Sequence, residues 1–189
     1  MTELEQYITS YFGVSQEDLS IIASLFIEQE LKKGEYFTKI DDYCNKLSFI
    51  RTGYMRVYAY KEEKEVTQWI SSQGYFVTDL QSLVFDLPSR WNIEALTDCE
   101  LYTISKENYR KISQKVAKWE HLEKLFLAKC FLTLEDRVFS FLSMTAEERY
   151  DHLYDQNKEL FNIIPLQNLA SMLGMTPETL SRIRKKKLG

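Results

Sequence analysis

The chain has 189 residues and a net charge of −4, with 44% hydrophobic and 14% aromatic residues. This length accommodates one large or two small domains, and the apolar content excludes global disorder. No run of about 18 apolar residues is present, so the sequence predicts no membrane-spanning helix. The acidic N-terminus Met1–Glu5 lacks the pattern of a signal peptide, and we expect a cytoplasmic protein.

Residue types that support catalysis or metal binding are scarce. The three cysteines, Cys44, Cys99 and Cys130, form no CxxC motif, and we expect them to be reduced and buried. The two histidines, His121 and His152, lie in predicted helices, which argues against an imidazole metal cluster. The sequence also lacks a glycine-rich phosphate loop, an HExxH motif and a Ser/His/Asp arrangement. It therefore predicts neither an enzyme nor a metal site.

The chain begins with helical periodicity over residues 3–29, where Ser15 is placed to cap a second helical segment. Over residues 31–104 the pattern changes to short apolar or alternating runs, separated by turn signals about every eight to twelve residues. The predicted strands are 47–50, 54–60, 65–70, 91–95 and 100–104. Their even spacing favours a closed antiparallel barrel or a double-sheet roll.

Helical periodicity returns after the strands, with a short helix after Ser105 and a long helix over about residues 116–144. Between residues 122 and 142 the long helix is apolar nearly all round, so it needs cover on more than one face. One face can cover the strands, and a second copy of the chain is the simplest partner for the other. The alternative is the central helix of a monomeric bundle. The residues expected at the dimer contact are Leu122, Leu125, Phe126, Lys129 and Thr133.

Residues 145–160 predict a connecting helix, and the C-terminal segment Pro165–Gly189 predicts a helix-turn-helix. Gly174 can adopt the left-handed conformation that ends the first helix. Thr176 is a good N-cap for the second helix, and Pro177 suits its first position. The first turns of such a second helix enter the major groove of double-stranded DNA.

The charge of this segment supports a DNA partner. Five basic residues follow Met175 and stand against one acid, Glu178, in a chain that is acidic overall. This concentrates the attraction for phosphate at one end of the sequence. Two alternatives stay open: a helical hairpin that only packs, and a frayed basic tail at residues 185–187.

A strand-rich roll, a long helix and a helix-turn-helix, in this order, resemble the Crp/Fnr family of bacterial transcription regulators. In the roll the similarity lies in segments that look like the turns and strands of a cyclic-nucleotide-binding jelly roll. These segments are 31–35, 47–58, 74–76 and 95–101.

The resemblance implies an α+β fold with three parts. An N-terminal antiparallel β jelly roll with N-terminal helices is expected at 1–115, a long central dimerisation helix at 116–144 and a helix-turn-helix DNA-binding domain at 145–189. It also implies a homodimer that binds a near-palindromic operator, responds to an effector through its roll and works with RNA polymerase. The family's β-wing is expected to be mostly absent or to precede Pro165.

The family's nucleotide pocket is where this sequence departs. Members that bind the nucleotide have Gly-Glu, a short helix and then Arg-Ser/Thr-Ala, whereas here Tyr75 follows Gly74 and Ser89 stands at the arginine position. Arg90 comes one residue later, and a shift of one residue on a strand turns a side chain to the other face. Trp91 replaces the usual alanine and would crowd the pocket. The candidate effector-pocket residues are Gly74, Tyr75, Phe76, Asp79, Ser89, Arg90 and Trp91.

No cofactor follows from the resemblance. We expect that a cyclic nucleotide is not the effector, although Arg90 could hold another anion if its loop is irregular. An iron–sulfur member would show an N-terminal cysteine cluster, and a haem-binding member a histidine in the roll. Neither is present in this sequence.

At the C-terminal end the family reads bases with the first turns of its second helix. Glu178 and Arg182 match the family's glutamate and arginine positions, and Pro177 stands where several members have a base-reading arginine. A carboxylate can accept a hydrogen bond from cytosine N4, and an arginine can donate to guanine O6 and N7. The residues predicted to contact DNA are Thr176, Pro177, Glu178, Thr179, Ser181, Arg182, Lys185 and Lys186.

The sequence thus predicts a dimeric, DNA-binding transcription regulator. The alternative is a small-molecule-binding jelly roll whose C-terminal helices form a protein-interaction module. An enzyme of the cupin type is disfavoured, because that chemistry needs histidines inside the roll and residues 31–104 contain none.

Overall fold

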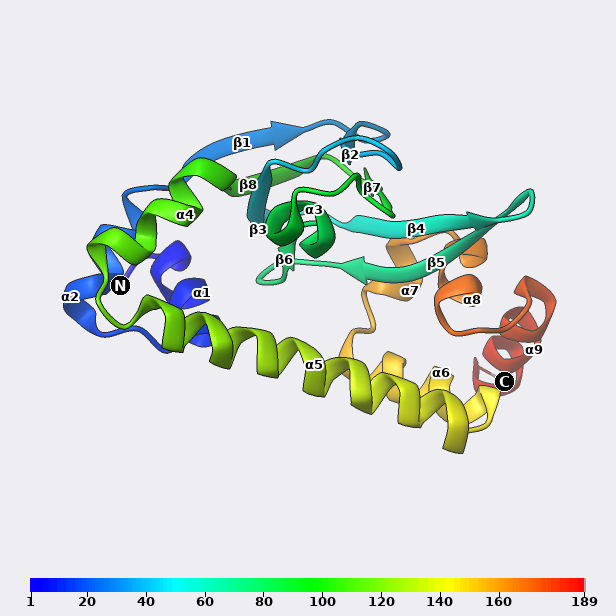
Figure 1. The fold of residues 1–189 in the computed structure, drawn as a ribbon. Helices are drawn as coiled ribbons and strands as arrows, with labels where there is room; N and C mark the ends of the chain where they lie inside the picture. Colours follow the sequence, from blue (N-terminus) through cyan, green and yellow to red (C-terminus); the bar gives the residue numbers. More distant parts are fainter. Residues whose placement is uncertain (189) are drawn as a thin grey trace. The chain divides into compact units, whose positions relative to one another are not determined.

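The computed structural model describes residues 1–188, so Gly189, the last residue of the expected DNA-binding domain, lies outside the described residues. The fold is α+β (Figure 1). The helices are α1 (Glu3–Phe12), α2 (Gln16–Ala23), α3 (Leu80–Phe85), α4 (Lys106–Lys115), α5 (Trp119–Ser143), α6 (Ala146–Gln156), α7 (Leu160–Ile163), α8 (Leu166–Met172) and α9 (Pro177–Leu188). The strands are β1 (Ile27–Leu31), β2 (Tyr36–Thr38), β3 (Lys46–Thr52), β4 (Met55–Lys61), β5 (Lys64–Ser71), β6 (Phe76–Val77), β7 (Asn92–Ala95) and β8 (Cys99–Ser105).

The chain forms two compact units. The roll unit comprises Met1–Val57 and Ile70–Phe131, and the helical unit comprises Tyr58–Trp69 and the described residues from Leu132 onward. The long helix α5 therefore contributes its N-terminal half to the roll unit and its C-terminal half to the helical unit. The outer parts of β4 and β5 also belong to the helical unit.

Two four-stranded sheets build the roll, in the orders β1-β8-β3-β6 and β2-β7-β4-β5. The strand β3 shows why the roll has two cores. Ile50 belongs to the apolar core of the roll interior, whereas Leu47 and Phe49 belong to a second core with α1, α2, α4 and the start of α5. Because alternate residues of a strand point to opposite faces, a strand covered on both sides is apolar on both.

Most predicted elements are confirmed, with one error in the N-terminal region. The five predicted strands and the long helix are present, and Ser15 caps α2 by accepting a hydrogen bond from Asp18 N–H. Residues 27–29, however, are not helical. They form part of β1, where Ile27 pairs with Thr103 of β8. This pairing joins residues far apart in the sequence, so local periodicity did not indicate it.

The short elements β2, β6 and α3 were not predicted. The region 145–188 contains helices and no strand among its described residues, so the β-wing that could have preceded Pro165 is absent there. In the part of the chain that the structure describes, no helix is long and apolar enough to cross a membrane. The same residues contain no group of His, Cys, Asp or Glu side chains arranged to hold a metal ion.

Candidate nucleic-acid interface

Backbone hydrogen bonds around a glycine close the C-terminal end of α8. Gly174 has φ +66°, and its N–H donates to the Ser171 carbonyl, while the N–H of Met175 donates to the Ala170 carbonyl. These two bonds form a Schellman cap, which favours a glycine in the left-handed conformation. The predicted role of Gly174 is therefore confirmed, and a short turn leads directly into α9.

The start of α9 also agrees with the sequence. The Thr176 hydroxyl accepts a hydrogen bond from the N–H of Thr179 at 3.2 Å, and Pro177 is the first helical residue. Leu180 is 0% exposed and Ile183 is buried, so this side of α9 faces the interior of the helical unit, where the helix contacts α8. The opposite side of its first turns faces solvent.

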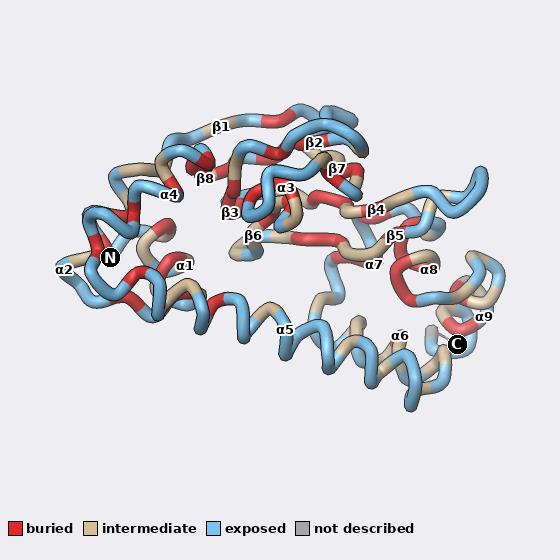
Figure 2. The backbone as a smooth tube through the Cα atoms, in the orientation of Figure 1, coloured by how far each residue is buried: buried red, intermediate tan, exposed pale blue. Residues whose placement is uncertain are grey.

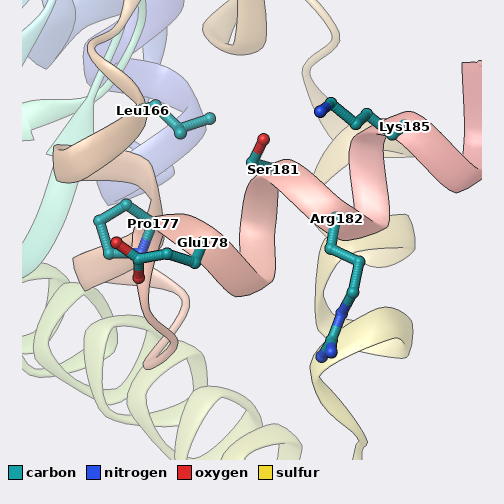
Figure 3. A pocket seen from close by; sticks show the side chains of 6 residues that line it. All are labelled: Leu166, Pro177, Glu178, Ser181, Arg182 and Lys185. Atoms are coloured by element: carbon teal, nitrogen blue, oxygen red, sulfur yellow. The ribbon is translucent and has the colours of Figure 1, made fainter.

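This outward side of α9 and the first turn of α8 line an open groove of about 500 Å³ (Figure 3). Arg182 follows Glu178 by one helical turn, so both extend from the same side of the helix. The lining residues are Leu166, Pro177, Glu178, Ser181, Arg182 and Lys185. Five of the residues predicted to contact DNA thus share one surface.

The helix terminus keeps the Glu178 carboxylate ionised. Hydrogen bonds from its own backbone N–H and from the Thr176 hydroxyl hold the pKa of Glu178 below its usual value. An ionised carboxylate acts only as a hydrogen-bond acceptor, whereas a guanidinium acts only as a donor. The groove therefore presents an acceptor at Glu178 and a fork of donors at Arg182.

The lysines at the end of α9 divide between two surroundings. Lys186 Nζ lies 3.0 Å from the carboxylate of Glu147, and Lys187 Nζ lies 2.8 Å from that of Asp151, both on α6. Pairing with Lys186 and Lys187 lowers the pKa of Glu147. Of the two lysines predicted to contact DNA, Lys186 is thus paired within its own chain, and Lys185 lies in the groove.

Several residues of the predicted effector pocket surround one buried carboxylate. Asp79 is 1% exposed and caps α3 by accepting a hydrogen bond from the N–H of Ser82 at 2.8 Å. It also accepts from the Ser89 hydroxyl at 2.9 Å and from the N–H of Arg90 at 3.0 Å. The Arg90 guanidinium lies over the Trp91 ring, 5.6 Å from its centroid. The chain's own carboxylate therefore uses the donors around the start of α3.

The other predicted pocket residues lie outside this group. Gly74 forms a turn with φ +82°, and Tyr75 is exposed. The ring of Phe76 meets the ring of Phe126 edge-on, in the core beneath the helices. Its strand neighbour Val77 belongs to the interior of the roll, and neighbouring residues of a strand point to opposite faces. Phe76 is therefore not directed into the roll.

The predicted dimer contact fails at Phe126. Its ring is 1% exposed and stacks on Phe12, so its own chain covers it and its predicted place in the contact is contradicted. Leu122 is half-buried against the same core, and Lys129 donates to the carbonyl of Ser10 in α1. These three residues lie on the side of α5 that faces the roll unit's own helices.

Some of the apolar residues that α5 leaves exposed follow a different line, here called the α5 seam. Figure 2 shows α5 largely exposed beyond its first turns. The seam residues are Leu125, Ala128, Leu132, Phe139 and Leu142. Their spacing of three, four and seven residues is that of a coiled coil. Leu125 belongs to both the predicted dimer contact and the seam. Thr133, which was also predicted at the contact, is exposed and follows the seam residue Leu132.

Comparison with known proteins finds a family that matches the roll. Residues 28–116 match the family described as "Cyclic nucleotide-binding domain". The matched segment extends from β1 to the end of α4, so α6–α9 lie outside the matched residues. No curated protein sequence matches the chain significantly.

Solved structures that share the fold include Crp/Fnr-family transcription regulators. FixK2 from Bradyrhizobium japonicum is 18% identical over 85% of this chain and 83% of its own, with a TM-score of 0.73. A CooA mutant from Carboxydothermus hydrogenoformans is 19% identical over 100% of this chain and 86% of its own, with a TM-score of 0.67. A cAMP-bound PfPKA-R fragment is 19% identical with a TM-score of 0.54, and covers 58% of this chain. The chain spans 40% of that fragment's length.

Proposed function

We propose that this protein is a homodimeric, DNA-binding transcription regulator. The observation that carries the proposal is the groove along α9. Its first turns expose Glu178, Ser181, Arg182 and Lys185 on one side, while the apolar side of the same helix is buried. Polar donors and acceptors displayed by one rigid helix are what base reading in the major groove needs.

In this proposal the α8–α9 pair is a helix-turn-helix and α9 is its recognition helix. The ionised carboxylate of Glu178 accepts a hydrogen bond from cytosine N4, and the guanidinium of Arg182 donates to guanine O6 and N7. Ser181 and Lys185 contact phosphates beside the bases, with Thr176 and Thr179 at the start of the helix. Because Lys186 is paired with Glu147, we assign its phosphate contact to Lys185 instead.

Two copies of the chain would associate through the α5 seam. Leucine and phenylalanine side chains with a seven-residue spacing are suited to packing against the same surface of a second helix. Such a dimer presents two recognition helices to successive major grooves, about 34 Å apart on a near-palindromic site. RNA polymerase is the further partner that a transcription regulator would need.

The roll is proposed to respond to an effector other than a cyclic nucleotide bound in the usual way. The carboxyl oxygens of Asp79 already accept the hydrogen bonds of Ser82, Ser89 and Arg90 around the start of α3, which a bound phosphate would otherwise need. The residue after Gly74 is Tyr75 rather than a glutamate that could bind a ribose. A regulator of this kind acts by shifting the population of DNA-binding conformations and needs no catalytic residues.

The decisive experiment uses a DNA duplex that the protein selects from a random-sequence library. Fluorescence anisotropy across a salt series should show affinity that falls steeply with salt, because phosphate contacts release counterions. Arg182→Ala should weaken binding by about 1–3 kcal/mol and relax the preference at one base pair.

Arg110→Ala is the matched control, because Arg110 is an exposed arginine on α4 of the roll unit. It should leave affinity and base preference unchanged. If the wild-type protein selects no sequence and binds no duplex at low salt, the protein is not a DNA-binding regulator, and a protein-interaction module is favoured instead. Unchanged base preference in Arg182→Ala would remove Arg182 from the reading residues.

A further inference from the structure

Two arginines meet at the C-terminal end of α8. Arg137 of α5 donates through Nη2 to the carbonyl of Met172 at 2.8 Å. Arg149 of α6 donates through Nε to the carbonyl of Leu173 at 2.9 Å. The last carbonyls of a helix lack intrahelical partners and carry the negative end of its dipole, so cations are favoured there.

An aromatic ring holds the two guanidinium groups in place. Phe141 lies with its ring centroid 5.1 Å from the Cζ atoms of both Arg137 and Arg149. The ring centroid of Trp69, in β5, lies 4.9 Å from the Cζ atom of Arg137. The Phe141 ring also lies close to Gly174, since a Cβ added there would approach Cε1 to 2.6 Å. We call Arg137, Phe141 and Arg149 the guanidinium clamp.

The clamp joins the end of α8 to the end of α5. The Nη1 atom of Arg149 donates to the carbonyl of Met144, directly after α5, at 2.8 Å. One guanidinium therefore binds the C-terminal ends of two helices. A further hydrogen bond, from the N–H of Thr67 to the Ser171 hydroxyl at 2.9 Å, links β5 to the same end of α8.

We propose that Arg137 and Arg149, with Phe141 between them, are positioning residues that set the angle at which α9 meets DNA. This inference rests on the proposed function. None of the clamp residues is among those that line the groove, so in this proposal the clamp contacts no base. It fixes the turn from which α9 departs, relative to the helix through which two copies would associate. Base contacts depend on that angle, whereas attraction between lysines and phosphates does not.

Lysine is the informative replacement for Arg137. Burial lowers the pKa of Arg137 to about 10, so the side chain is charged at neutral pH. A lysine keeps the positive charge but has no planar fork to stack on aromatic rings. Arg137→Lys and Arg149→Lys therefore preserve the charge of the helical unit and remove the geometry of the clamp.

The experiment measures affinity for two duplexes, one selected by the wild-type protein from a random library and one with the same bases scrambled. Each lysine variant should lower the ratio of selected to scrambled affinity by about tenfold or more, as expected when roughly one base contact is lost. Affinity for the scrambled duplex should stay within about threefold, because the phosphate contacts remain. Arg110→Lys makes the same exchange on α4 and should leave the ratio unchanged.

Hydrogen exchange provides a second measurement on the same variants. The amides of Gly174 and Met175 form the cap that ends α8, and they should exchange faster in both lysine variants than in the wild type. If the wild-type protein and the lysine variants discriminate equally well between the two duplexes, this inference is wrong but the proposed function stands. A wild-type protein that selects no sequence overturns the proposed function and this inference with it.

Discussion

At the scale of single residues, Asp79 shows how hydrogen bonds can satisfy a buried carboxyl group. Its carboxylate accepts hydrogen bonds from two backbone N–H groups and one hydroxyl, all from the segment around α3. Burying an ionised group is costly unless such partners replace water. The same donors then have no free capacity for the anion of a ligand. The residue thus has both a structural role and a consequence for effector chemistry.

Asp79→Asn should lower the free energy of unfolding by about 1–3 kcal/mol. The new amide group would face the N–H of Ser82 or of Arg90, and two donors cannot bond to each other. Urea denaturation measures the change. Asp155→Asn, the same exchange at an exposed position of α6, should alter stability by less than about 0.5 kcal/mol. Equal effects of the two substitutions would mean that the Asp79 network contributes little.

At the scale of elements, the turn between α8 and α9 depends on one glycine for two reasons. Gly174 adopts φ +66°, and its Cα lies against the ring of Phe141. Gly13, which ends α1, has a similar φ of +63° but open space around it. The two positions therefore separate the cost of the backbone conformation from the cost of a steric contact.

Gly13→Ala should destabilise the protein by about 1–2 kcal/mol, the cost of a left-handed conformation for an alanine. Gly174→Ala should cost about 1–3 kcal/mol more, because the methyl group must displace the Phe141 ring. Chemical denaturation of both variants gives the difference. If the two variants proved equally stable, Phe141 would be free to move and the guanidinium clamp would be loose.

The sequence predicted those elements whose signals are local. Thr176, Pro177 and Gly174 each act within one turn of the chain, and their caps are confirmed. The sequence failed where a distant segment decides the outcome. Residues 27–29 became a strand because β8 lies beside them, and Phe126 is buried because α1 covers it. In a helix that is apolar nearly all round, periodicity alone cannot tell which side its own chain covers.

At the scale of the whole molecule, the question is what covers the exposed apolar side of α5. Leu132 is 57% exposed on the seam, and Leu134, two residues later, is 46% exposed outside it. Exposed apolar residues aligned along a helix commonly mark a protein contact. The two leucines make a matched pair, since they share a helix, a residue type and a similar exposure.

Leu132→Asp should convert the dimer to a monomer, because one substitution puts a carboxylate on each side of an apolar seam. Leu134→Asp should remain dimeric. Light scattering coupled to size-exclusion chromatography measures both masses. Retention of the dimer in Leu132→Asp, or its loss in Leu134→Asp, would place the contact on another side of α5.

The same pair connects assembly to DNA binding. Once one α9 of a dimer is bound, the second binds as an intramolecular event, which strengthens overall binding by about 10²–10⁴-fold. Leu132→Asp should lose that factor on a duplex with two half-sites and lose little on a duplex with one. Leu134→Asp should bind both duplexes like the wild type. Because α9 is unchanged in both variants, a loss confined to the two-half-site duplex would locate the defect in assembly. An equal loss on both duplexes would instead mean that the substitution disturbs α9 itself.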